Sequence, residues 1–128
     1  MSAEALPPLS EAQMEIMSIV WDCEQCTVAD VLKSLQATRP VTRNTVHTMM
    51  TRLADKGWLT VHNDGGRFVY VAAVGRDVVQ QECVERMIQT VFDGSTEGLV
   101  LSLLQNRTLS KDEATRIRRM IREAEERS

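Results

Sequence analysis

The stretch from Thr42 to Gly57 constrains the fold of this chain more than any other. Its apolar residues recur at the i, i+3, i+4 and i+7 spacing of one helix face, at Val46, Met49, Met50 and Leu53. The opposite face carries compact polar side chains where an ordinary solvated face is rich in Glu and Lys: Asn44, Thr45, His47, Thr48, Thr51 and Arg52. Compact donors and acceptors suit the edges of bases in a DNA major groove. The pattern therefore predicts a DNA-binding recognition helix that ends at Gly57. Thr42 is its N-cap, at a helix N-terminus that is also expected to face a DNA phosphate.

Two further helices are predicted before this stretch. Ser10 and Gln13 have the spacing of a capping box, which opens a helix that runs to about Asp22. Thr27 and Asp30 open a second helix, whose apolar residues again repeat with helical spacing: Val28, Val31, Leu32 and Leu35. A proline at position 40 ends it, because the residue before a proline is pushed out of the helical conformation. Three short helices with brief connections, the third polar on its outer face, are typical of a helix-turn-helix.

After Gly57 the hydrophobic period changes from that of a helix to that of a strand. Residues 58–62 and 67–71 are β-branched and aromatic runs on either side of Asn-Asp-Gly-Gly, which is a strong hairpin signal. A hairpin directly after a helix-turn-helix predicts a winged helix, in which Arg67 at the base of the hairpin supplies positive charge. Three aromatic residues are expected in the core and not in a ligand-binding box: Trp21, Trp58 and Phe68.

Residues 76–128 are predicted to be helical and to hold more apolar surface than three helices can bury alone. Ser95 caps a short helix that is apolar nearly all round, and Ser110 with Glu113 opens the last helix with a capping box. The surplus predicts a second copy of the chain as partner, since reading a DNA site usually takes two heads at a fixed spacing. We expect six residues at this dimer interface: Val91, Leu99, Leu103, Ile117, Met120 and Ile121.

These assignments give a mainly α fold with a small β-hairpin (α+β), in two parts. Residues 9–75 form a predicted winged-helix DNA-binding domain and residues 76–128 a predicted helical dimerisation domain. The net charge of the whole chain is −3, which counts against a strong non-specific DNA binder. From position 39 to position 76, however, six basic residues stand against only two acidic ones: Arg39, Arg43, Arg52, Lys56, Arg67 and Arg76 against Asp55 and Asp64. Basic charge gathered around the predicted helix and hairpin is the footprint that DNA binding needs.

The residue types on the predicted recognition helix suggest separate roles. Asn44 suits an adenine edge, and Thr48 suits a thymine methyl group or a phosphate. Three basic residues are expected to contact phosphates, which position a protein without specifying sequence: Arg43, Arg52 and Arg67. His47 is equally consistent with a DNA contact and with an ordinary surface histidine. The competing interpretation of the whole face is a solvated helix surface that binds nothing.

The chain has three cysteines, an odd number for a secreted disulfide framework, which favours a reducing compartment. Cys23 and Cys26 form a single Cys-x-x-Cys pair, a weak zinc signal without a second pair or nearby histidines. We interpret the pair as having no role, with a thiol sensor as the alternative, and Cys83 as a small apolar filler. No run approaches the length of a membrane span and no signal peptide is evident. The sequence therefore predicts a cytoplasmic protein without direct membrane insertion.

Taken together, the motifs and their order resemble the BlaI/MecI/CopY family of bacterial winged-helix repressors. The resemblance runs from about Leu9 to Glu126 and rests on these segments: LSEAQMEIMSIVW (9–21), TVADV (27–31), NTVHTMMTRLADKGWL (44–59), VYVAAV (69–74), FDGSTEGLVLSLL (92–104) and LSKDE (109–113). It implies a homodimeric repressor whose winged helix binds half of a near-palindromic operator in double-stranded DNA. Thr45, Thr48 and Arg52 match the recognition-helix positions of the family, whereas Asn44 and His47 replace other polar side chains.

The resemblance also bears on how repression is relieved. This chain departs from the family's two regulatory patterns, proteolytic cleavage and copper binding. A membrane sensor-protease is a candidate partner, because antibiotic-responsive members of the family are cut at an Asn-Phe bond in the dimerisation region. The aligned position here is Ser102-Leu103, which disfavours cleavage by that route. Copper-responsive members carry a cysteine-rich tail, whereas this chain ends in Glu-Arg-Ser without a cysteine.

Three classes of function were weighed. A sequence-specific repressor is favoured, and a winged-helix module that contacts only protein is the alternative. An enzyme is disfavoured, because the sequence has no glycine-rich phosphate loop, no nucleophile elbow and no metal-binding histidine pair. We accordingly expect no catalytic residues, no metal and no cofactor.

Overall fold

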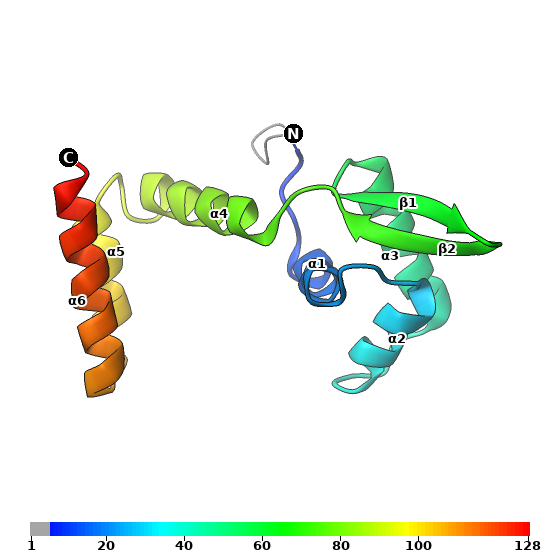
Figure 1. Ribbon diagram of the computed structural model, residues 1–128, viewed down its shortest axis with the longest axis horizontal. Coiled ribbons are helices and arrows are strands. Elements are labelled where there is room, and N and C mark those ends of the chain that lie inside the picture. The colour runs from blue at the N-terminus through cyan, green and yellow to red at the C-terminus, as the bar shows by residue number, and fades with distance from the viewer. Residues whose placement is uncertain (1–5) are drawn as a thin grey trace. The chain divides into compact units, whose positions relative to one another are not determined.

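The computed structural model describes residues 6–128, which form six helices and one hairpin in these residues (Figure 1). The elements follow in the order α1 (Glu11–Cys23), α2 (Val28–Gln36), α3 (Arg43–Asp55), β1 (Leu59–Asp64), β2 (Arg67–Ala72), α4 (Arg76–Thr90), α5 (Thr96–Gln105) and α6 (Lys111–Glu126). The predicted mainly α fold with a single hairpin is therefore confirmed. Two compact units divide between Glu85 and Arg86, inside α4. The assignment of separate functions to residues 9–75 and 76–128 stays a prediction.

Local capping starts the first two helices where the sequence predicts. The backbone N–H of Gln13 donates to Ser10 Oγ at 3.2 Å, and the N–H of Ser10 donates back to Gln13 Oε1 at 3.0 Å. Thr27 and Asp30 make the same reciprocal pair, at 3.2 and 3.0 Å. Each box satisfies backbone donors that have no partner inside the helix, so the chain direction is fixed at both starts.

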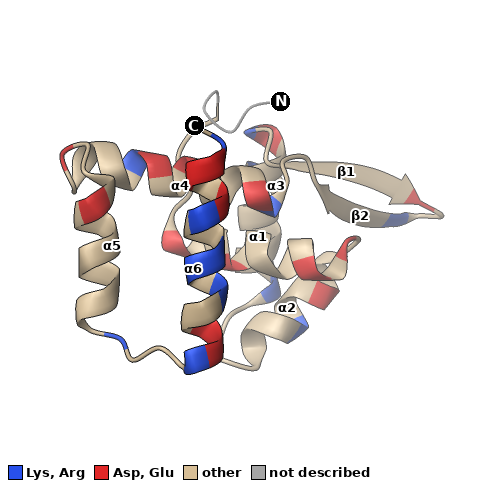
Figure 2. Cartoon of the chain, turned by 60° about the vertical axis from the view of Figure 1, so that its left-hand side comes forward, with Lys and Arg blue, Asp and Glu red and all other residues tan. Residues whose placement is uncertain are grey.

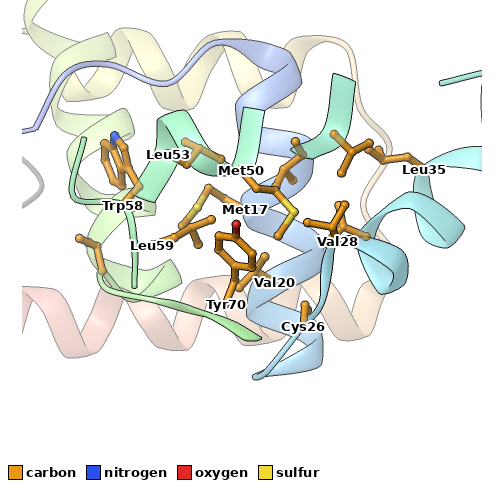
Figure 3. Close-up of a cluster of buried hydrophobic side chains, with 14 of the residues drawn as sticks. Met17, Val20, Cys26, Val28, Leu35, Met50, Leu53, Trp58, Leu59 and Tyr70 are labelled. Atoms are coloured by element: carbon orange, nitrogen blue, oxygen red, sulfur yellow. The ribbon is translucent and has the colours of Figure 1, made fainter. Parts of the chain in front are cut away.

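The core of the first unit lies where α1, α2 and α3 meet the hairpin (Figure 3). Each helix buries three apolar residues: Ile16, Met17 and Val20 on α1, Val28, Val31 and Leu35 on α2, and Val46, Met50 and Leu53 on α3. Trp58 and Leu59 close the cluster at the start of β1, and Tyr70 closes it from β2. The predicted helical stripes of α2 and α3 are thus confirmed, with Leu32 and Met49 only partly buried.

The hairpin is a regular antiparallel pair in which Leu59 lies opposite Ala72 and Asp64 opposite Arg67. Gly65 and Gly66 form the two-residue turn with φ of 60° and 88°. Positive φ at both central positions is the requirement of a type I′ turn, which glycine meets without strain. Cys26 pairs with Tyr70 along the outer side of β2, through N–H to O distances of 3.0 and 2.7 Å.

Phe68 corrects one expectation about the core. Its side chain is 61% exposed, although it was predicted to be buried. Phe68 lies opposite Asn63 near the turn, whereas the buried residues Leu59 and Tyr70 lie nearer the base of the hairpin. Trp58 is buried and Trp21 is partly buried, as expected.

The second unit has very little buried surface of its own. Helices α5 and α6 begin at Ser95 and Ser110, whose hydroxyls accept from the N–H groups of Gly98 and Glu113 at 2.9 and 3.1 Å. These two caps are as predicted, although only the Ser110 half of the last capping box is found. Neither helix buries a single residue. Figure 2 shows α5 almost free of charge and α6 carrying many basic and acidic residues.

Cys83 lies in α4, as predicted, but it is exposed and not an apolar filler. Burial was expected because free cysteines are among the most buried residue types, but its place on α4 leaves the thiol at the surface. Among residues 6–128, no helix is long and apolar enough to cross a membrane.

Candidate nucleic-acid interface

The N-terminus of α3 is fixed by the side chains around it. The N–H of Thr45 donates to Thr42 Oγ1 at 3.2 Å, and the two threonine hydroxyls lie 2.9 Å apart. Just before α3, the side chain of Gln36 at the end of α2 donates through Nε2 to the carbonyl oxygen of Val41 at 3.2 Å. The predicted Thr42 cap is confirmed, and the connection between α2 and α3 is held at both ends. A helix start with ordered, exposed N–H groups is also a favourable place for a phosphate.

The exposed face of α3 carries polar groups that are free to bind a ligand. Within residues 6–128, five of these side chains make no hydrogen bond and no ion pair: Arg43, Asn44, His47, Thr48 and Arg52. All five are exposed, while the opposite side of the same helix is buried in the core. Thr51 differs, because its hydroxyl donates to the carbonyl oxygen of His47 at 2.8 Å. The structure therefore brings together the predicted base-contacting and phosphate-contacting residues of α3 on one rigid surface.

Two of the six basic residues counted toward the local charge are already paired. Arg39 Nη2 lies 3.1 Å from Glu15 Oε1. Arg76 Nη2 lies 2.7 Å from Asp22 Oδ1 and donates to the carbonyl oxygen of Ser18 at 3.1 Å. The guanidinium of Arg76 also lies 5.5 Å from the centre of the Trp21 ring, a cation–π distance. The basic footprint is therefore narrower than the sequence indicated, and it consists of Arg43, Arg52, Lys56 and Arg67.

Arg67 sits on the hairpin, apart from the helix residues in sequence but in the same unit. It is exposed and lies opposite Asp64 directly beside the turn, so it stands at the tip of the hairpin and not at its base as predicted. Hydrogen bonds from the backbone and side chain of Thr27 lower the pKa of Asp30, and the positive charge of Arg67 adds to this effect. Arg67 is thus close enough to α2 to be felt electrostatically, while its guanidinium stays available at the surface.

Sequence reasoning missed two features of this surface. Gln36 was not expected to bridge the turn before α3, and the only signal was a long amide side chain just before a helix break. Phe68 was assigned to the core, yet it lies exposed beside Arg67 on the hairpin. In the described part of the chain, no group of three or more histidine, cysteine or acidic residues is arranged to hold a metal ion.

The predicted dimer residues lie in a different part of the fold. Val91 follows the end of α4, Leu99 and Leu103 lie on α5, and the other three lie on α6: Ile117, Met120 and Ile121. All six are exposed or only partly buried in the single chain, with Val91 at 75% and Met120 at 61%. They belong to the second unit, and their role in dimerisation stays a prediction.

Comparison with known proteins now adds to this geometry. The family model described as penicillinase repressor matches residues 9–123. The chain belongs to the penicillinase repressor family. The chain is 27% identical over 118 residues to the penicillinase repressor of Bacillus licheniformis, with 92% of each chain covered. It is 26% identical over 113 residues to the methicillin resistance regulatory protein MecI of Staphylococcus aureus, covering 88% of this chain and 92% of MecI.

A solved member of the penicillinase repressor family shares the fold of the first unit. The solution structure of monomeric Bacillus licheniformis BlaI in complex with the blaP half-operator is similar at 32% identity and a TM-score of 0.51. The similarity covers 57% of this chain and 89% of that one. The predicted winged-helix fold and the predicted class of function, a DNA-binding repressor, are confirmed. A winged helix that contacts only protein is not favoured.

Proposed function

We propose that this penicillinase repressor family member represses transcription by binding a near-palindromic operator through the exposed face of α3. The observation that carries the proposal is the set of unpaired polar side chains on that face. An exposed surface that only meets water gains nothing from a layer of Asn, Thr and His in a helix, since these residues lower helix propensity. The solved BlaI complex with a half-operator supports the same class of ligand, double-stranded DNA.

The side chains fall into two groups, those that contact base edges and those that fix the position of the protein on the DNA. Asn44 and Thr48 contact base edges in the major groove, and His47 contributes a further contact to a base or phosphate. Thr42 and Thr45 hold the helix start, while Arg43, Arg52 and Arg67 contact phosphates from the helix and the hairpin. Sequence specificity then comes from a few compact groups, and affinity from a small number of charges.

The protein acts as a homodimer in this proposal. A single winged helix reads only a half-site, and the second unit exposes apolar side chains that a second copy would cover. Contiguous exposed apolar surface of this kind usually marks an interaction site. The cytoplasm is the compartment that supplies both the DNA and reduced thiols.

A membrane sensor-protease is the proposed regulatory partner, but the residues at the family's cleavage position differ in this chain. Ser102 and Leu103, at the position aligned with the cleavage site of the family, lie within α5 and are exposed. Because the residue pair differs from Asn-Phe, we propose that release from DNA does not depend on cutting at this bond.

The test begins with selection of genomic fragments by the purified protein, followed by binding measurements on the best fragment. We expect enrichment of a short inverted repeat. Asn44→Ala and Thr48→Ala should each weaken binding to that repeat by roughly 1–3 kcal/mol, with little change on random DNA. Direct readout is lost in these variants while the phosphate contacts stay.

Thr90→Ala is a matched control, because Thr90 is an exposed helical threonine outside α3 and the hairpin. It should bind the repeat like the unchanged protein. If the Asn44 and Thr48 variants weaken binding to specific and random DNA equally, these residues do not read bases. Binding without any preferred sequence would overturn the proposed function.

A further inference from the structure

The loop between α1 and α2 places two thiols in very different surroundings within four residues. Cys23 is the last residue of α1 and is exposed, whereas Cys26 is fully buried in the core of the first unit. The sequence pattern of this pair is open to two interpretations, no role and a thiol sensor. The structure supplies observations that separate them.

The backbone between the two cysteines is held in a tight and uncommon turn. Glu24 has φ of 67° and ψ of −54°, and the N–H of Gln25 donates to the carbonyl oxygen of Cys23 at 2.7 Å. These angles and this i to i+2 hydrogen bond describe a γ-turn of the rare, positive-φ kind. Non-glycine residues adopt such backbone angles at a cost, and they gather at sites with a functional constraint. The turn folds the end of α1 back toward Cys26.

The two side chains are close enough to affect each other. Burial raises the pKa of the Cys26 thiol to about 12, and a hydrogen bond with the Cys23 side chain and the charge of Cys23 add to the effect. Cys26 therefore stays protonated at neutral pH, whereas Cys23 is the thiol that solvent reaches. An exposed thiol with a second thiol beside it is the arrangement of a redox-sensitive pair.

Cys26 is also attached to the hairpin. Its N–H donates to the carbonyl oxygen of Tyr70 at 3.0 Å, and its own carbonyl oxygen accepts from the N–H of Tyr70 at 2.7 Å. Tyr70 lies in β2, three residues after Arg67. Any movement of Cys26 out of the core is therefore passed directly to the strand that carries a predicted phosphate contact.

We propose that Cys23 and Cys26 form a dithiol site that hydroperoxides oxidise to an intramolecular disulfide, and that this disulfide weakens operator binding. The effect on operator binding rests on the proposed function, whereas the formation of the disulfide does not. The pair is separate from α3 and from Cys83, which lies exposed on α4.

The reaction balances with a hydroperoxide as the two-electron oxidant. The Cys23 thiolate attacks the outer peroxide oxygen, the O–O bond breaks, and an alcohol or water leaves with a proton while Cys23 becomes a sulfenic acid. The Cys26 sulfur then attacks the Cys23 sulfur, the S–O bond breaks, and the oxygen leaves as water with the Cys26 proton. Two thiols and one hydroperoxide thus give one disulfide, one alcohol (or water) and one water.

The consequence follows from where the Cys26 sulfur lies before oxidation. The side chain belongs to the buried core cluster and lies at its edge, where the chain passes from α1 to α2 (Figure 3). Bonding to the exposed Cys23 draws this sulfur toward the surface and leaves the core less well filled. The Cys26–Tyr70 pair then loosens, and the hairpin loses its support on the outer side of β2.

The experiment uses the full-length Cys83→Ser variant, in which Cys23 and Cys26 are the only thiols. Hydrogen peroxide should remove both free thiols and reduce the mass of the intact protein by two hydrogens, and dithiothreitol should reverse both changes. Affinity for the selected inverted repeat should fall by about tenfold, a usual size for coupling between two sites. Hydrogen exchange at the Tyr70 amide should become faster in the oxidised protein.

The double variant Cys23→Ser, Cys83→Ser is the matched control, because Cys23 is exposed and its replacement leaves the core intact. It should bind the repeat normally and should not respond to peroxide through a disulfide. Peroxide that leaves both thiols free, or that yields only a sulfinic acid, overturns the dithiol site. A disulfide that changes neither operator affinity nor Tyr70 exchange overturns its effect on the hairpin. If the reduced protein binds no specific DNA, the proposed function fails, while mass and exchange still decide on the site.

Discussion

At the scale of single residues, Cys26 combines core packing, backbone pairing with the hairpin and a raised thiol pKa. Its side chain fills the core, its backbone pairs with Tyr70, and its thiol titrates far from the ordinary range because burial opposes the thiolate. Five polar residues of α3 show the opposite arrangement, with exposed side chains that have no hydrogen-bond or ion-pair partner among residues 6–128: Arg43, Asn44, His47, Thr48 and Arg52. The buried Cys26 thiol and the exposed polar side chains of α3 thus belong to the same compact unit.

The raised pKa of Cys26 predicts a loss of stability in alkali. Below the ordinary thiol pKa of 9.0, the thiol is protonated in both the folded and unfolded states, so it contributes nothing to the pH dependence. Above that pH the unfolded chain loses this proton while the folded chain keeps it up to about pH 12. The free energy of unfolding should therefore fall by roughly 1 kcal/mol between pH 8 and pH 10 from this group alone.

Urea unfolding of the unchanged protein and of Cys26→Ala at several pH values measures this contribution. Other groups titrate in the same range in both proteins, so the difference between their slopes isolates Cys26. Equal slopes would mean that the thiol is no harder to ionise in the folded state than in the unfolded state.

At the scale of elements, the parts that the sequence predicted well are those with local causes. The caps at Ser10, Thr27 and Thr42 depend on side chains three residues away, and the hairpin turn depends on two adjacent glycines. The errors concern distant neighbours. The pairing of Arg76 with Asp22 joins residues 54 positions apart, and no local pattern announces it. Phe68 fits a buried strand pattern, but its exposure depends on how far the hairpin extends past the core.

The type I′ turn gives a prediction at this scale. Gly66 has φ of 88° and no neighbouring atom that a Cβ would meet, so only the backbone conformation opposes a side chain there. Gly66→Ala should lower the free energy of unfolding by roughly 1–2 kcal/mol, because L-residues resist the left-handed region. Asparagine tolerates that region and is favoured at the first turn position, so Gly65→Asn should change stability by less than about 0.5 kcal/mol.

Chemical denaturation of both variants tests the turn type. Similar losses at the two positions would indicate that the turn is not of type I′. Hairpin order can be followed independently through exchange protection of the β1 and β2 amides.

At the scale of the whole molecule, the first unit has a well-packed core, whereas α5 and α6 of the second unit have no buried residues. Helices α5 and α6 keep apolar side chains such as Leu101 and Ile121 more than half exposed, at 58% and 52%. Burial of such side chains is the main favourable contribution to association. The proposed homodimer would supply that burial and would also provide the second DNA-reading head for an inverted repeat.

Ile117→Glu together with Ile121→Glu should produce monomers that still fold, because neither residue is buried in the single chain. Loss of one head should weaken binding to the full inverted repeat on the order of a hundredfold, since the second half-site no longer benefits from the first. Light scattering reports the mass in solution, and titration of the full repeat and a half-site reports the affinity.

The control for this prediction is Thr115→Glu together with Arg122→Glu, two exposed positions on α6 away from its apolar stripe. It adds the same number of glutamates to the same helix and should leave the dimer intact. A dimer that persists with glutamates at 117 and 121 would mean that other residues form the interface.

The two tryptophans are held in the first unit, and their positions in the chain determine what fluorescence can report in these experiments. Trp21 Nε1 donates to the carbonyl oxygen of Val74 at 2.9 Å, and Trp58 Nε1 donates to that of Pro7 at 3.2 Å. These are the only tryptophans of the chain, Tyr70 is its only tyrosine, and all three precede residue 86. Intrinsic fluorescence will therefore follow melting of the first unit alone. Unfolding of residues 86–128 will be silent in that signal and will need far-ultraviolet circular dichroism to be seen.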